Sequence, residues 1–186
     1  MARLERLLST VREVSLIDSQ LEGEPRTPAP LGELLSELVD GFRLRGTGRL
    51  TYELELPDRE VCVSASPERL VQVFENVLDN ARSFSPASGT VWVRLERRAD
   101  EALVTIRDQG PGIPDQHLGG IFARFFSFRE EAGEHSSPDA SAPDEEHTGL
   151  GLAIARAIVD GYGGAISARN STEGGAVFEI RLDALR

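Results

Sequence analysis

The period of the hydrophobic pattern changes repeatedly along this chain, and the changes limit the folds available to it. Apolar residues recur at helical spacing in "LGELLSELVDGFRLR" (31–45), whereas residues 50–56 alternate between apolar and polar after "GTG". "EVCVSAS" (60–66) predicts a second short strand. Helices and strands that alternate within 186 residues predict an α/β (α+β) domain with one sizeable core.

The rest of the chain continues this alternation. Ser66 and Pro67 form a helix start, with an N-cap followed by proline in the first turn, and the predicted helix extends to Phe84. Two strand pairs are predicted, "TVWVRLERR" with "ALVTIRD" and "AISARN" with "GAVFEIRL", the second joined by the turn "STEGG". A third helix is expected between these pairs, from about Gly149.

Composition restricts the class of partner. The formal net charge of −11 argues against nucleic acid and against direct contact with a membrane surface, because both attract lysine and arginine. The single cysteine, Cys62, allows no internal disulfide, and the histidines at 117, 135 and 147 match no metal-binding spacing. No apolar run approaches the about 20 residues of a membrane span. We therefore expect a soluble, cytoplasmic polypeptide.

The N-terminal residues carry a separate pattern. Apolar residues at positions 4, 7, 11, 14 and 21 follow the spacing of a coiled-coil seam, interrupted at Asp18. Residues 1–22 are thus either an amphipathic helix packed on its own domain or one half of a helical hairpin or dimer stem. "GEPRTPAP" (23–30) predicts a linker, and residues 31–186 then form the domain.

Two asparagines on the predicted helix 67–84 are the first candidates for chemistry. Asn76 and Asn80 lie four residues apart and hence on one helix face. Two unpaired amides are expensive to bury, so this face is not simply core. Their oxygens suit a hard divalent cation or the phosphates that it carries, although the pair alone would more simply be a solvated face.

Two glycine pairs supply the other candidates. In "DQGPGIP", Asp108 ends a strand, and Gly110 and Gly112 leave room for a flat ligand whose exocyclic amino group a carboxylate can bind. In "TGLGL", Gly149 and Gly151 precede a helix, where backbone N–H groups and the helix dipole can meet phosphate. Each glycine pair alone is a weak signal.

In this order, these elements resemble the catalytic ATP-binding domain of sensor histidine kinases of two-component systems, within the superfamily that includes gyrase, Hsp90 and MutL-type ATPases. The matching segments are "ENVLDNARSFSP" (N box), "DQGPGIP" (G1 box), "IFARFF" (F box) and "TGLGLAIARAIVDGYGG" (G2 box). The resemblance implies a two-layer sandwich in which three helices cover one face of a mixed five-stranded sheet. It also implies that residues 1–22 are the remnant of the second helix of the dimerisation hairpin.

The resemblance assigns roles to matched residues. Asn76 would coordinate Mg²⁺, Asn80 would contact the triphosphate of ATP, Asp108 would bind the adenine amino group, and Arg124 would lie near the phosphates. Asn76, Asn80 and Arg124 are the predicted catalytic set. The other predicted nucleotide-binding residues are Gly110, Gly112 and Ile113 at the base, Phe122 and Phe125 as lid anchors, and Thr148, Gly149, Leu150 and Gly151 at the phosphate end.

The implied activity is that of a protein-histidine kinase. Such a domain passes the ATP γ-phosphoryl group to a histidine on a dimerisation helix, for relay to a response regulator. The implied partners are therefore that helix, a second copy in a full-length homodimer, and the regulator, with the parent protein anchored in the bacterial inner membrane. None of the three histidines has the setting of a phosphoacceptor, so we expect a fragment that lacks it.

Two alternatives stay open beside the kinase interpretation, and two departures from the family pattern support the first of them. Ser83 stands where the family usually has lysine, and the lid carries many acidic residues between 130 and 146, which we expect to face solvent. These features fit a degenerate module that holds nucleotide, or nothing, and works through protein contacts. A hydrolytic ATPase of the superfamily would have glutamate at position 76; the adjacent Glu75 is rotated by about 100° around the helix. The kinase interpretation is favoured.

Overall fold

The computed structural model describes residues 23–45, 50–124, 126 and 149–186. The main sheet has the strand order β2-β4-β5-β7-β6. Its strands are β2 (Thr51–Glu55), β4 (Thr90–Arg98), β5 (Glu101–Arg107), β7 (Ala176–Asp183) and β6 (Ala165–Asn170). β2 runs parallel to β4 and the other neighbours pair antiparallel, so the sheet is mixed and five-stranded, as predicted.

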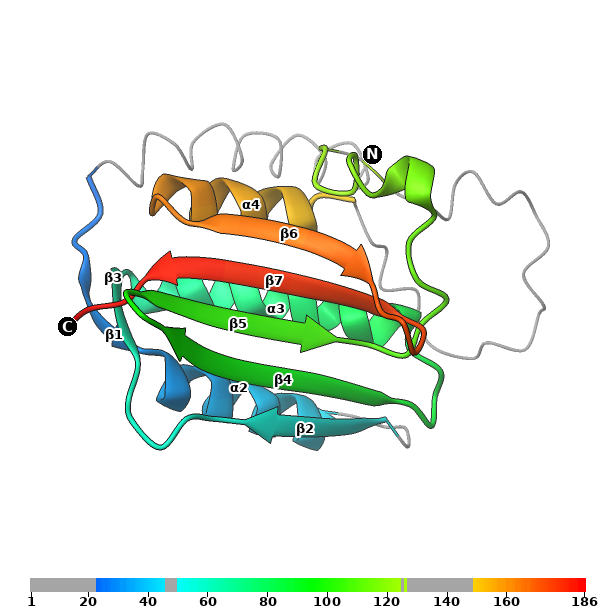
Figure 1. Ribbon diagram of the computed structural model, residues 1–186, viewed down its shortest axis with the longest axis horizontal. Helices are drawn as coiled ribbons and strands as arrows, with labels where there is room; N and C mark the ends of the chain where they lie inside the picture. The colour runs from blue at the N-terminus through cyan, green and yellow to red at the C-terminus, as the bar shows by residue number, and fades with distance from the viewer. Residues whose placement is uncertain (1–22, 46–49, 125, 127–148) are drawn as a thin grey trace, which may run out of the picture.

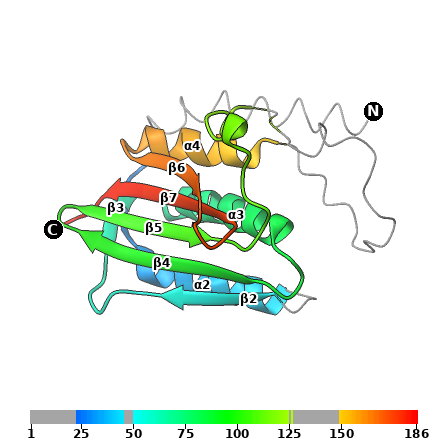
Figure 2. The ribbon, with the colours of Figure 1, turned by 45° about the vertical axis from the view of Figure 1, so that its right-hand side comes forward.

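Three helices lie on one face of this sheet (Figure 1; Figure 2). They are α2 (Leu31–Arg45), α3 (Pro67–Phe84) and α4 (Gly151–Gly161). This arrangement confirms the predicted two-layer sandwich. None of the described helices is both long and apolar enough to cross a membrane.

The central helix, α3, forms as its sequence predicts. The Ser66 hydroxyl accepts a hydrogen bond from the Arg69 N–H, and Pro67 occupies the first turn, where its missing N–H costs nothing. All six residues of its predicted apolar face are buried: Leu70, Val73, Phe74, Val77, Leu78 and Ala81. Burying each large side chain contributes about 1.5–3 kcal/mol, so this face anchors the helix to the sheet.

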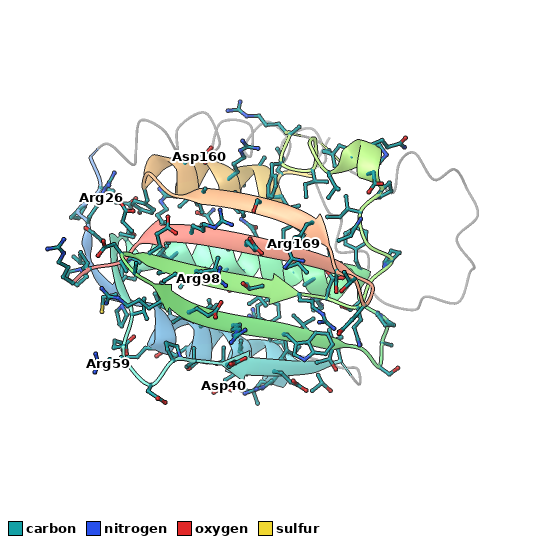
Figure 3. All side chains as sticks on the ribbon, viewed as in Figure 1. Arg26, Asp40, Arg59, Arg98, Asp160 and Arg169 are labelled. Carbon is teal, nitrogen blue, oxygen red and sulfur yellow. The ribbon has the colours of Figure 1, made fainter. Side chains whose placement is uncertain are left out.

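On the opposite face of the sheet (Figure 3), the described residues include charged side chains and no helix. Arg94 pairs with Glu55 at 3.3 Å and Glu96 at 3.5 Å, and Glu179 accepts ion pairs from two arginines on β6 and β7. Figure 3 shows Arg98 and Arg169 on this face. Long side chains shield apolar surface with their stems, and Leu103 is only 3% exposed there. The domain therefore needs no third layer.

The predicted linker, residues 23–30, is wrong in its second half. Thr27–Pro30 form β1, which pairs antiparallel with β3 (Cys62–Ala65) in a separate two-stranded sheet. Arg26 donates to the Gly161 carbonyl at the end of α4, at 3.0 Å. The two prolines of "TPAP" suggested a linker, but an edge strand such as β1 tolerates proline. The predicted stem helix, residues 1–22, lies outside the described residues.

β3 also holds the last residues of the chain. Val63 forms an isolated bridge with Ala184, and the Leu185 N–H donates to the Cys62 carbonyl at 2.7 Å. The segments that enter and leave the domain therefore lie together at β3, at the left edge of Figure 1. The polar loops after β5 and β6 lie at the opposite end.

Candidate functional site

Asp108 is buried directly after the last residue of β5. Its side chain is 2% exposed, and its carboxylate oxygen Oδ1 accepts hydrogen bonds from the N–H groups of Gly110, at 2.8 Å, and Ala176, at 3.0 Å. Burial raises the pKa of Asp108, and the two backbone hydrogen bonds oppose this with smaller effects. The carboxylate is thus fixed in one orientation by the backbone of two separate segments.

The turn between β6 and β7 forms the wall beside Asp108. Gly175 has a φ of +84°, and a Cβ at this position would overlap the backbone carbonyl of Asp108. Arg107 pairs with Glu173 in the same turn at 2.6 Å and stacks on the Trp92 ring, with its Cζ 4.3 Å from the centroid. The sequence "STEGG" predicts only a hairpin connection here. Its role as a wall depends on contacts that no local pattern reveals.

The G1 segment is hydrogen-bonded to Asn170, the residue at the end of β6 where the same turn begins. The Ile113 N–H donates to Asn170 Oδ1 at 2.7 Å, and Asn170 Nδ2 donates to the Ile113 carbonyl at 2.7 Å. A Cβ on Gly112, whose φ is +79°, would lie 2.9 Å from Asn170 Oδ1, and one on Gly110 would lie 2.7 Å from the Phe84 carbonyl. The structure shows that these glycines make room for neighbouring protein atoms, and their predicted role in making room for a ligand stays a prediction.

α3 and α4 meet at the second cluster. A Cβ on Gly151, the first residue of α4, would lie 3.1 Å from Asn76 Oδ1, so the absence of a side chain lets the two helices approach. Asn76 Nδ2 is buried and has no hydrogen-bond partner among the described residues. Asn80 lies half-buried one turn further along α3. Gly149, with φ +67°, and the fully buried Leu150 lead into α4.

Of the two phenylalanines predicted as lid anchors in the F box, the structure describes Phe122. Its ring is 8% exposed and meets Phe178 of β7 edge to face, with centroids 6.5 Å apart. The Arg156 Cζ lies 5.6 Å from the Phe122 centroid. Phe122 therefore ties the segment after the short 3-10 helix η1 (Asp115–His117) to the sheet.

One further predicted residue has no partner among the described residues, and several others lie outside them. Arg124 is exposed and makes no hydrogen bond or ion pair with the part of the chain that the structure describes. Phe125, Thr148 and the acidic residues 130–146 lie outside the described residues. Their predicted roles stay predictions.

The residues that could replace the family lysine or act as a general base, Arg82 and Glu75, interact with residues of α2, α3 and β2. Glu75 approaches Arg45 of α2 at 3.8 Å. Arg82 approaches Asp79 at 3.3 Å and lies beside Tyr52 of β2, where burial raises the tyrosine pKa and the Arg82 charge opposes that shift. Both side chains therefore lie near α2 and β2.

Comparison with known proteins decides the family. The model described as histidine kinase-, DNA gyrase B- and HSP90-like ATPase matches residues 65–186. The chain belongs to this ATPase family. The family binds ATP, and the N, G1 and G2 boxes of this member are the segments that the structure brings together around α3.

The relatives of this ATPase domain include sensor kinases, which confirms the resemblance found in the sequence. Sensor protein ChvG of Agrobacterium fabrum is 33% identical over 195 residues, covering 98% of this chain and 31% of ChvG. The mycobacterial sensor histidine kinase MprB superposes with a TM-score of 0.70 at 30% identity, covering 86% of this chain and 97% of that chain. Histidine kinase ThkA, in complex with response regulator TrrA, superposes with a TM-score of 0.73 at 24% identity, covering 99% of this chain and 49% of that chain. The chain thus spans about a third of the length of ChvG.

Proposed function

We propose that this domain binds Mg·ATP between α3, α4 and the G1 segment, and transfers the γ-phosphoryl group to a histidine on a dimerisation helix. In the full-length protein, proposed to be a homodimer, the phosphoryl group would pass on to a response regulator, the kind of partner named for ThkA. The observation that carries the proposal is the buried carboxylate of Asp108. Two backbone N–H groups bond to its Oδ1, which leaves Oδ2 as an acceptor for the adenine amino group.

Asn76 and Asn80 fit the phosphate end of the proposed site. The Asn76 amide belongs to a half-buried residue and its nitrogen is unpaired among the described residues, so its bonding capacity is not used by the protein, and its oxygen would be the ligand for Mg²⁺. When bound, Mg²⁺ supplies charge neutralisation on the phosphates. Asn80 and Arg124 would contact the triphosphate, together with the N–H groups at the start of α4.

The protein would contribute position and charge rather than a base. The attacking imidazole is itself the nucleophile: a nitrogen–phosphorus bond forms as the bond from the γ-phosphorus to the bridging oxygen breaks, and ADP leaves. Water attack would need a general base, and Glu75 faces Arg45 instead. This observation favours phosphotransfer over hydrolysis.

Calorimetric titration with a non-hydrolysable ATP analogue, with and without Mg²⁺, tests the binding step. Asp108→Asn keeps the shape and the Oδ1 acceptor, but it turns the Oδ2 acceptor into a donor that opposes the adenine amino group. We expect at least about a 100-fold loss of affinity, since a buried polar mismatch is discriminated strongly. Asp115→Asn, which removes the same charge from an exposed residue of η1, should bind normally.

Transfer is tested separately, with γ-labelled ATP and a longer version of the protein that carries the preceding helix. Label on a histidine of that helix supports the kinase. Binding without any transfer favours a nucleotide-holding interaction module. If the wild-type chain does not bind the analogue at all, the kinase and the ATPase interpretations fail together.

A further inference from the structure

We propose that Asn170 is a positioning residue for nucleotide binding, which holds the G1 segment in its base-binding shape without touching the nucleotide. This inference rests on the proposed function of the site. Asn170 lies outside the four motifs of the sequence and ends β6, which no other part of the mechanism uses.

The contact itself is reciprocal. Asn170 accepts from the Ile113 N–H and donates to the Ile113 carbonyl, both at 2.7 Å, and so pairs with both backbone groups of a residue 57 positions away, as a residue of a neighbouring strand would. This pairing needs a donor and an acceptor side by side on a short side chain. Among the residues of this size, only asparagine offers both on one planar group.

The neighbours of Asn170 show what the pairing achieves. Asn170 and Ala176 are the last paired residues of the β6–β7 ladder. The N–H of Ala176 bonds to the carboxylate of Asp108, while Asn170 bonds to Ile113. One residue pair of the sheet, Asn170 with Ala176, therefore forms hydrogen bonds with both ends of the segment 108–113. This segment is the part of the chain proposed to bind adenine.

The segment between these two grips would otherwise be adaptable, because it contains Gly110 and Gly112, which give the backbone the widest conformational range. Ordering such a segment at the moment of binding reduces affinity, and ordering it beforehand removes that cost. The hydrogen bonds of Asn170 are solvent-exposed, so their contribution to global stability is small. Their main effect is therefore expected in binding.

Two variants and one control test the inference, with calorimetric titration of ADP and of the non-hydrolysable ATP analogue. Asn170→Ala removes both hydrogen bonds, and Asn170→Asp keeps the shape but sets a carboxylate oxygen against the Ile113 carbonyl. We expect each variant to bind both nucleotides with about tenfold lower affinity, equal to about 1.4 kcal/mol. Arg169→Ala, on the opposite face of the same strand, should leave binding unchanged.

A second readout separates positioning from general damage. Hydrogen exchange of the Ile113 amide should accelerate in both Asn170 variants, while the melting temperature stays within a few degrees of that of the control. Equal losses for ADP and the ATP analogue support the inference, because the contact acts at the base end. Unchanged affinity in Asn170→Asp overturns it, and so does a loss confined to the triphosphate. If wild type binds neither nucleotide, the proposed function itself has failed.

Discussion

The two ends of the candidate nucleotide site are built in different ways. At the base end, the protein completes its own contacts: Asp108 accepts two backbone N–H groups and Ile113 pairs with Asn170. At the phosphate end, the Asn76 amide nitrogen is buried without a partner, and Arg124 is exposed and unpaired among the described residues. On the proposed function, base recognition is preorganised by the fold, whereas phosphate recognition is completed by Mg·ATP.

The largest test of this difference is Gly175→Ala. A methyl group there would overlap the Asp108 carbonyl at a positive φ, so we expect a loss of about 3 kcal/mol or more in the free energy of unfolding. Gly174→Ala is the matched control, since it also has a positive φ but no atom within 4 Å, and should cost about 1 kcal/mol. Urea denaturation measures both values. Equal values would show that the wall beside Asp108 is not tightly packed.

Asn76→Ala probes the other end. We expect the ATP analogue to lose its Mg²⁺-dependent affinity, about 30-fold, because the proposed metal contact is gone. The melting temperature without nucleotide should hold or rise, since an unpaired buried amide costs free energy. Titrations with and without Mg²⁺ separate the effects, and Gln72→Ala, one turn earlier on α3, is the control. A marked loss of stability would mean that the phosphate end is also preorganised.

A smaller effect is expected in the pH dependence of stability at the base end. Burial raises the pKa of Asp108, so its protonated form stabilises the fold at low pH and this stabilisation is lost as pH rises through the raised pKa. Asp108→Asn should therefore melt above wild type at neutral pH, with the difference shrinking toward about pH 4, the ordinary aspartate range. Thermal denaturation across that interval measures it. A variant that melts lower at every pH would contradict the proposed cost of burying this carboxylate.

The smallest effect concerns charge at the phosphate end. Ser83 lies seven residues after Asn76, two turns along the same face of α3, so Ser83→Lys would bring an ammonium group toward the phosphates. We expect about a threefold gain in affinity for the ATP analogue, declining as salt is added. Ser88→Lys adds the same charge to an exposed loop residue and should have no effect. A gain with adenosine alone would argue against a phosphate contact.

Local signals were sufficient for the elements and for the residues next to them. The Ser66 cap, Pro67 and the apolar spacing of α3 predicted the observed helix, because all three act within a few residues of each other. Asp108 was predicted as a site residue from the glycines that follow it. Its burial by the β6–β7 turn was not, since that contact joins residues 68 positions apart.

The predictions that failed or were missed depend on tertiary contacts. The "TPAP" segment has the composition of a linker, and only its pairing with β3 makes it a strand. Asn170 resembles an ordinary turn residue until Ile113 is placed beside it. Arg82 stands one position before Ser83 in the sequence, and its ion pair with Asp79 and its charge effect on Tyr52 became apparent only in the structure.

The first strand of the domain, β1, and the residues that follow its last strand, β7, both pair with β3. β1 pairs with β3, and Ala184 forms a bridge with Val63 of the same strand, at the end of the domain opposite the loop after β5 (Figure 1). If the domain rotates as a rigid body about an axis near β3, residues close to β3 move little and residues far from it move most. A nucleotide bound at the proposed site, at the opposite end of the domain, would therefore move through a larger distance than β3 itself. On the proposed function, rotation about β3 would set how far the phosphoryl group moves, although β3 lies at the end of the domain opposite the proposed site (Figure 1).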